Sequence, residues 1–158
     1  MVGQVELKIG DVLKKFHDVS GGKCAVLETD YSLVNRTAED QILPFCQEND
    51  IAVLVRGPVA MGLLADKYDA DTVFTDPVRQ GWNKGGAGRE GYEERLAKVD
   101  TVREALGGAD MAETAGKYGL SHPMNPVAIP GATSTDQAKR NAAAGASALP
   151  ADLYDKLR

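Results

Sequence analysis

The sequence predicts an α/β fold in which parallel strands alternate with helices. Three short apolar runs, at residues 25–27, 51–55 and 127–129, have the length and composition of buried strands. Amphipathic segments long enough to be helices separate them, and strands that alternate with helices form parallel sheets joined by right-handed crossovers. Neither a linker nor a repeat of fixed period interrupts this order, so we expect residues 1–158 to form a single domain.

The chain is expected to begin with a short strand at residues 4–9. A helix follows, with Val12, Leu13 and Phe16 on one side. The strand at 25–27 then runs into polar residues at its carboxyl end. Functional sites form at that end of the strands in parallel α/β sheets, so the polar residues mark a candidate site.

A second amphipathic helix is predicted from the spacing of Ile42, Phe45 and Cys46. Thr37 precedes it and has the side chain of a good N-cap. Pro44 lies inside the pattern, where it either bends the helix or marks its true start.

Residues 66–91 form a long polar segment rich in aspartate and glycine. Loops of this length in compact domains are usually lids, binding loops or disordered segments, and we expect a lid-like loop. Trp82 is the only tryptophan of the chain. It either packs locally or stacks on a ligand, and local packing is the commoner role.

Two helices are predicted after this loop. The first covers residues 92–106 and ends at a pair of glycines. Asp110 caps the second helix, which carries Met111, Ala115 and Tyr118 on its inward side. This helix is expected to stop at Gly119.

The turn after the third predicted strand is a candidate anion site. Pro130 and Gly131 lead to Ser134, which can accept a hydrogen bond from the amide three residues on, while Gln137 can reach back to the Ser134 amide. A strand that passes through glycine into a helix N-terminus directs N–H groups at one place, which suits a phosphate. An ordinary strand–turn–helix corner has the same features, so both interpretations stay open. A last short helix begins at Pro150.

Composition argues against several classes of partner. The net charge of -5 and the pI near 5.0 argue against nucleic acid. The chain has no apolar run long enough to span a membrane and no signal-peptide core at its start, so we expect a cytoplasmic protein. Cys24 and Cys46 are predicted to be packed thiols, not a disulfide. His17 and His122 lack partners at metal spacing, so we expect no metal site.

Three stretches resemble the aldo-keto reductase family. Residues 129–134 (IPGATS), with Gln137 and Asn141, resemble its motif after the eighth barrel strand. Residues 30–36 (DYSLVNR) and 56–64 (RGPVAMGLL) resemble the segments that close strands six and seven. The resemblance implies a TIM-type (β/α) barrel, but a complete barrel needs about 250 residues. We therefore expect a partial (half) barrel, with parallel strands equivalent to barrel strands five or six to eight.

The resemblance also implies a site for a nicotinamide dinucleotide. It assigns the aromatic residue Tyr31 to the nicotinamide ring, and the loop residues Gly57, Pro58, Val59 and Gly62 to the pyrophosphate and ribose. It assigns the turn residues Gly131, Thr133 and Ser134 to the adenosine 2′-phosphate, and the amides of Gln137 and Asn141 to adenine.

The implied coenzyme is NADP(H), with NAD(H) as an open alternative. Thr133 stands where many relatives have a basic residue for the 2′-phosphate. Lys139 or Arg140 would then have to supply the positive charge.

The family's carbonyl reduction uses a tyrosine acid, a lysine, an aspartate and a histidine, all in the first half of the barrel. Tyr31, Asp66 and Lys67 are of the right types but match other parts of the pattern. We therefore expect no catalytic residues in this chain, which would be inactive alone.

It would belong to an NAD(P)H-dependent oxidoreductase that works with a complementary N-terminal half-barrel chain. The alternative is a truncated or vestigial half-barrel that binds nucleotide or serves as an oligomerising scaffold. Exposed strand edges also favour a homodimer.

Overall fold

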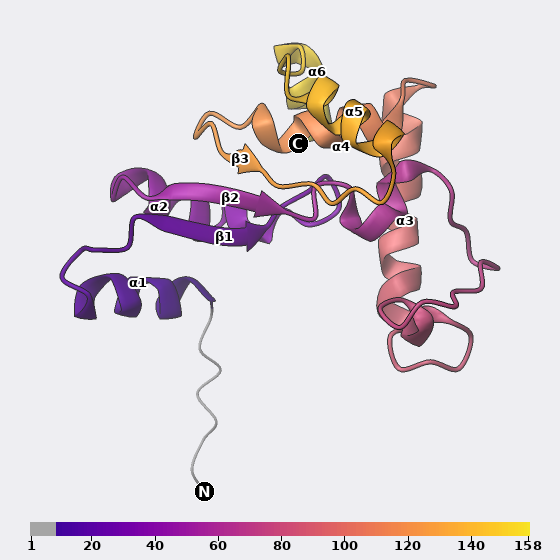
Figure 1. Ribbon diagram of the computed structural model, residues 1–158, viewed down its shortest axis with the longest axis horizontal. Coiled ribbons are helices and arrows are strands. Elements are labelled where there is room, and N and C mark those ends of the chain that lie inside the picture. The colour runs from indigo at the N-terminus through magenta and orange to yellow at the C-terminus, as the bar shows by residue number, and fades with distance from the viewer. Residues whose placement is uncertain (1–8) are drawn as a thin grey trace, which may run out of the picture.

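The computed structural model describes residues 9–158, so the strand expected at 4–9 falls almost wholly outside the described residues. Three parallel strands form one sheet in the order β1–β2–β3 (Figure 1). They are β1 (Val26–Asp30), β2 (Ala52–Arg56) and β3 (Val127–Ala128). The predicted α/β architecture is confirmed, since helices connect consecutive parallel strands.

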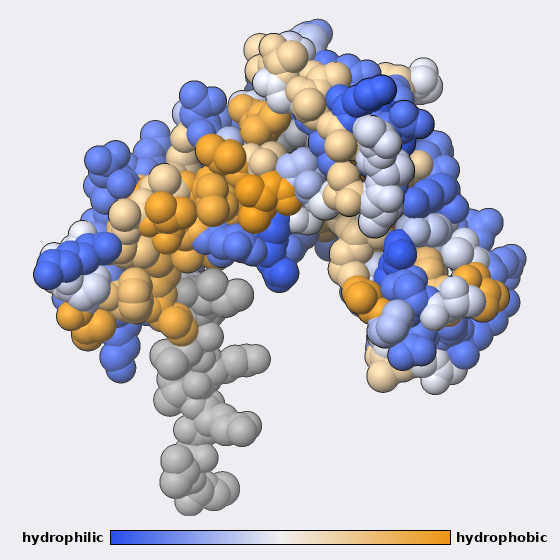
Figure 2. Space-filling model, in the orientation of Figure 1, coloured by the Kyte–Doolittle hydropathy of each residue, from blue (hydrophilic) through white to orange (hydrophobic). Residues whose placement is uncertain are grey.

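Side chains alternate along β2, so the sheet has one covered and one open face. Val53 and Val55 are buried on the covered face. The register pairs Leu54 of β2 with Glu28 of β1 and with Val127 of β3. Paired residues point to the same side of a sheet, so these three side chains share the face opposite Val53 and Val55. Val127 is 56% exposed on the other side. This open face comprises Val26, Glu28, Asp30, Ala52, Leu54, Arg56, Val127 and Ile129. Figure 2 shows apolar residues gathered over the strands.

Two helices cover the other face. α2 (Ile42–Glu48) packs against β2, and α4 (Met111–Leu120) packs against β3. The cap predicted for α4 is confirmed, because the Asp110 carboxylate accepts a hydrogen bond from the Glu113 amide at 2.9 Å. The predicted inward residues of α4 are buried as well, namely Met111, Ala115 and Tyr118. The helix ends at Leu120, one residue beyond the glycine that was expected to stop it.

The start of the second predicted helix differs from expectation. Thr37 caps no α-helix; it opens the 3-10 turn η1 (Thr37–Glu39), and its hydroxyl donates to Asn35 Oδ1 at 2.9 Å. α2 itself begins at Ile42, which places Pro44 in the first turn. The backbone N–H groups of a first turn have no partner within the helix, so proline is tolerated there. Of the two alternatives for Pro44, it marks the start.

The first predicted helix is present as α1 (Ile9–Val19), but it exposes most of its apolar side. Leu13 is buried against the core, whereas Val12 and Phe16 are 50% and 56% exposed. α1 packs on α2 and is held there by an edge-to-face contact between His17 and Phe45, with ring centroids 5.5 Å apart. The sequence predicted one apolar side for this helix, and the structure covers only part of that side.

The segment 66–91 packs on α3 (Arg89–Leu106) around an aromatic cluster formed by Tyr68, Phe74, Trp82 and Tyr92. Trp82 is 6% exposed and stacks on Tyr92, with ring centroids 5.3 Å apart and planes 17° apart. The Arg95 guanidinium lies 4.9 Å from the Trp82 ring centroid. The expected local packing of Trp82 is confirmed. The loop lies beside α3 (Figure 1), and its lid-like role stays a prediction.

The remaining elements frame the carboxyl end of the sheet. They are η2 (Ala60–Ala65), η3 (Gln80–Trp82), α5 (Thr135–Ala144) and α6 (Ala151–Leu157). α5 packs on α4, and α6 packs on α3. Both cysteines are buried free thiols, as predicted. Among residues 9–158, no helix combines the length and apolar character that crossing a bilayer requires.

The aromatic cluster should be a major source of stability for the 66–91 segment. We expect Trp82→Ala to lower the free energy of unfolding by about 3–5 kcal/mol, because it leaves a cavity beside three other rings. Urea denaturation followed by circular dichroism measures this change. The control Val78→Ala alters a side chain that is 70% exposed in the same segment and should have little effect. Equal losses in the two variants would contradict the packing described.

Candidate functional site

The loops that follow the three strands all lie at one edge of the sheet. Because the strands are parallel, the residues after β1, after β2 and after β3 all emerge at the carboxyl edge. In Figure 1 the arrows of β1, β2 and β3 point the same way, towards α3. Two of the three loops contain most of the site residues predicted from the sequence.

The loop after β2 depends on glycine at two positions. Gly57 has φ +66°, and a Cβ there would lie 3.2 Å from Asp30 Oδ1. Gly62 has φ +93°, and a Cβ there would lie 3.1 Å from the Tyr68 ring. Between them, Ala60 and Met61 also have positive φ values of 49° and 57°, which side chains rarely adopt. Such strain persists where the surroundings impose it and concentrates at functional sites.

The turn before α5 is fixed by side chains that the sequence singled out. Ser134 Oγ accepts from the Gln137 amide at 3.2 Å, as predicted. Gln137 Oε1, however, accepts from the Thr133 amide at 2.7 Å and from the Thr133 hydroxyl at 2.9 Å, not from the Ser134 amide. Ser134 is extended (φ -147°, ψ 159°), so the preceding residue lies within reach of the amide side chain. Asn141 Nδ2 donates to the Gly131 carbonyl at 3.2 Å, which fixes the other end of the turn.

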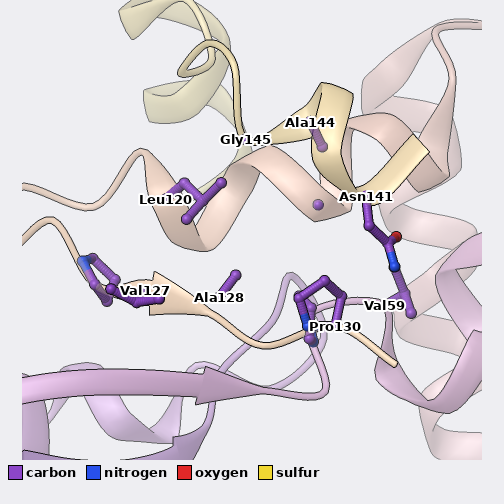
Figure 3. A pocket seen from close by; sticks show the side chains of 11 residues that line it. Val59, Leu120, Val127, Ala128, Pro130, Asn141, Ala144 and Gly145 are labelled. Atoms are coloured by element: carbon purple, nitrogen blue, oxygen red, sulfur yellow. The ribbon is translucent and has the colours of Figure 1, made fainter. Parts of the chain in front are cut away.

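A cavity of about 290 Å³ joins these two loops (Figure 3). Pro58 and Val59 line it from the loop after β2, and Asn141 lines it from α5. Ala128 and Leu120 contribute apolar walls from β3 and α4. The structure thus brings three of the predicted site residues to one mostly apolar cavity that carries an amide.

Tyr31 does not join this group. It is 1% exposed and lies on the covered side of the sheet, with its ring centroid 5.6 Å from that of Tyr118 and 5.9 Å from that of His122. Its hydroxyl donates to Glu39 Oε1 at 2.7 Å. Burial, together with the hydrogen bond to Glu39, raises the pKa of Tyr31. A ring buried in this way is not accessible for stacking on a ligand.

Asp66 and Lys67 have other partners as well. The Asp66 carboxylate accepts from Arg103 Nε on α3 at 2.9 Å. The Lys67 ammonium lies 5.1 Å from the centroid of the Tyr68 ring. Tyr31, Asp66 and Lys67 therefore lie in separate environments. Within residues 9–158, no three His, Cys, Asp or Glu side chains are grouped so that they could hold a metal ion.

The pairing of Arg56 with carboxylates of β1 at the carboxyl edge of the open face was not predicted. Arg56 Nη2 donates to Asp30 Oδ2 at 2.6 Å, and Arg56 Nε lies 3.9 Å from Glu28 Oε1. Asp30 and Arg56 are the last residues of β1 and β2, Glu28 is the middle residue of β1, and all three side chains project on the side opposite Val55. Glu28 and Arg56 lie one residue beyond the apolar runs of the predicted strands and Asp30 lies three beyond, so the strand alternation carried past these runs is the signal that could have found them.

Comparison with known proteins identifies this arrangement. Parallel strands joined by helices, with loops gathered at their carboxyl edge, define part of a TIM-type barrel. Residues 9–158 match the model of the aldo/keto reductase family. The chain therefore belongs to the aldo/keto reductase family.

Individual relatives agree with this assignment. The uncharacterized oxidoreductase YqkF of Bacillus subtilis is 30% identical over 111 residues, which are 70% of this chain and 34% of YqkF. An aldo-keto reductase from Bacillus halodurans in its holo form superimposes with a TM-score of 0.66 and 28% identity, covering 92% of this chain and 45% of that one. An aldo/keto reductase from Klebsiella pneumoniae, in complex with NADP and acetate, shares the fold at a TM-score of 0.59 and 22% identity, over 96% of this chain and 44% of that one. The chain thus spans less than half the length of these proteins.

The partly buried Glu39 carboxylate should make stability depend on pH. Burial opposes its ionisation, but the hydrogen bond from Tyr31 and the charges of Arg36 and Arg158 prevail and lower the pKa of Glu39 below its usual 4.5. A depressed pKa contributes stability that is fully present above the unfolded-state pKa and is lost as pH falls through the folded-state value. We expect the free energy of unfolding to fall between about pH 5 and pH 3. Urea denaturation at several pH values measures this fall.

The matched variant is Glu39→Gln, which keeps an acceptor for the Tyr31 hydroxyl but cannot titrate. This variant should be less stable than the parent chain at neutral pH. Its free energy of unfolding should change less over the same pH range. A pH profile identical to that of the parent chain would show that Glu39 is not the group responsible.

Proposed function

We propose that this chain forms the coenzyme-binding half of an NAD(P)H-dependent carbonyl reductase. The observation that carries the proposal is the pinned turn before α5, where Gln137 and Asn141 hold residues 131–133 beside the cavity. Family membership supports the reaction class, and the glycine-dependent loop after β2 supplies a second ligand-binding segment at the same edge.

The residues at this edge suit a dinucleotide. A Cβ at Gly131 would meet nothing within 4 Å, so a ligand group has room to approach the backbone there. Thr133 and Ser134 stand at the N-terminus of α5, where helix N–H groups and the helix dipole favour a phosphate. In our assignment Gly57, Pro58, Val59 and Gly62 enclose the pyrophosphate and ribose, and Gln137 and Asn141 contact adenine. When bound, the coenzyme supplies the hydride.

The coenzyme is NADP(H) in this proposal, with NAD(H) as the alternative. Lys139 and Arg140 are exposed on the first turns of α5 and are the cations nearest in sequence to the turn. Cationic side chains at this place favour a 2′-phosphate. A lower Kd for NADP⁺ than for NAD⁺ would support NADP(H).

The remaining half of a barrel completes the site. The outer edges of β1 and β3 have no strand partner among residues 9–158, and the open face presents Val26 and Val127 at more than half exposure. We propose that a complementary half-barrel covers this face and provides the proton donor for carbonyl reduction. The buried free thiols are consistent with a cytoplasmic protein.

The open face also favours a second candidate function. Exposed apolar surface bounded by unpaired strand edges promotes association of identical chains. The alternative is therefore a scaffold that forms a homodimer through this face, binds nucleotide at most and catalyses no reaction.

Binding of the coenzyme tests the proposed site. We expect Asn141→Ala to raise the Kd for NADP⁺ about threefold to tenfold, because one hydrogen bond contributes about 0.5–1.5 kcal/mol. Isothermal titration calorimetry on the full chain measures the Kd. Ala143→Ser, at an exposed position of the same helix, is the control and should leave the Kd unchanged. NMR shifts induced by NADP⁺ that cluster away from residues 57–62 and 131–141 would overturn the assignment.

Assembly is the second test. We expect the chain at low micromolar concentration to sediment as a species larger than a monomer, or to bind a hydrophobic dye, because the open face is uncovered by its own residues. Val127→Glu should abolish self-association through this face, whereas Val78→Glu, at an exposed site in the 66–91 segment, should not. A compact monomer that leaves the dye unbound would contradict the exposure of this face.

A further inference from the structure

The helix α1 presents an apolar stripe that residues 9–158 leave largely exposed. Val12, Phe16 and Val19 follow one another at intervals of four and three residues, which places them in one line along a helix. Their side chains are 50%, 56% and 75% exposed, whereas Leu13, on the neighbouring side of the helix, is 5% exposed. Apolar surface is visible where α1 lies in Figure 2. A stripe with this spacing is of the kind that packs on a second helix.

α1 is fixed to the rest of the fold by its other side. Leu13 is buried in the core, and the His17 ring contacts the Phe45 ring of α2 edge to face. In Figure 1 α1 lies at the periphery of the molecule, apart from α3, α4, α5 and α6. Because the anchoring side chains hold the helix in place, the stripe is a preformed surface, and little ordering is needed when a partner binds.

The charges beside the stripe favour an antiparallel partner helix with the same sequence. Lys15 and Asp18 are exposed on one flank of the stripe, and the ion pairs within residues 9–158 involve neither of them. In a parallel pair each side chain would face its own counterpart, like charge against like charge. In an antiparallel pair centred near Phe16, the rise of about 1.5 Å per residue brings Lys15 of each copy almost level with Asp18 of the other.

The apolar side chains are self-complementary in the same arrangement. Phe16 of one copy meets Phe16 of the other at the axis, and Val12 meets Val19 in both directions, as two-fold symmetry requires. α1 has 11 residues and is about 16 Å long, so the contact is smaller than the standard interface of about 1,600 Å². We therefore expect a weak dimer that forms at high protein concentration.

A lipid surface suits this helix less well than a second copy does. Helices that lie in a membrane interface carry an excess of lysine and arginine on their polar side. α1 carries two lysines and two aspartates, so these charges cancel. An anionic bilayer therefore has no net charge on α1 to attract.

We propose that the stripe formed by Val12, Phe16 and Val19 is a dimer contact, in which α1 of two copies of this chain pair antiparallel around a two-fold axis near Phe16. Lys15 of each copy pairs with Asp18 of the other and sets the direction of the helices. The contact uses no residue of the proposed coenzyme site or of the open face, so it is independent of the proposed function.

Sedimentation equilibrium of the Val127→Glu chain tests this contact, because that substitution blocks association through the open face. We expect a monomer–dimer equilibrium with a Kd on the order of 10⁻⁴ M. Phe16→Glu in this background should raise the Kd about tenfold or more, since it buries a charge at the centre of the contact. Lys14→Glu changes an exposed lysine on the opposite side of α1 and should leave the Kd unchanged. Circular dichroism checks that each variant is folded.

Exchanging the charges tests the direction of the helices. Lys15→Glu and Asp18→Lys each place like charges opposite one another in the antiparallel pair, so each should raise the Kd about threefold to thirtyfold. The chain with both substitutions should recover the affinity, and so should an equal mixture of the two single variants, because opposite charges face one another again. In a parallel pair neither single substitution would weaken the dimer.

Three results would overturn the proposal. The first is a Val127→Glu chain that stays monomeric up to about 1 mM. The second is a dimer that neither single charge substitution weakens, or that the double substitution does not restore. The third is a monomer that binds phosphatidylcholine vesicles and loses this binding with Phe16→Glu, which would assign the stripe to a lipid surface. None of these results bears on the coenzyme site, which Asn141→Ala tests separately.

Discussion

The alternation of side chains along β2 is the constraint on which the rest of the structure depends. Val53 and Val55 lie under the helices, which forces Leu54 and Arg56 to the opposite side. A slip of one residue would exchange the two sets and place a guanidinium in the apolar core. The same parity, transmitted through the register, places Asp30 beside Arg56 and sends Tyr31 into the core.

The candidate site is built mainly from backbone geometry. Gly57 and Gly62 allow the loop after β2 to turn where a Cβ would meet Asp30 or Tyr68. Helix capping then sets the position of the other segment, since Ser134 ends the extended chain and begins α5. Residues far apart in sequence reach one cavity because parallel strands all end at the same edge.

Structural features that depend on residues close together in the sequence could be predicted, whereas features that depend on tertiary contacts could not. The caps at Asp110 and Ser134 were predictable because donor and acceptor are three residues apart. Tyr31 could not be placed from its motif alone, because its face is decided by the register and by packing against Tyr118. For α1 the pattern identified the apolar side, but a sequence does not show whether a partner lies opposite, and Phe16 remains exposed. The pairing of Arg56 with Asp30 depends on the register of β1 and β2, which the motif at residues 56–64 does not contain.

The hydrogen bonds within the turn before α5 have a consequence for molecular recognition. Gln137 and Asn141 already hold Thr133 and Gly131 through their amides. In the coenzyme complex that we propose, the adenine base would meet a preorganised surface and would order few new groups on binding, which favours affinity. It must also compete for amides that already have partners, so each new bond is an exchange. In that complex, discrimination between bases would depend on which base best replaces the internal hydrogen bonds, so the turn itself would contribute to selectivity.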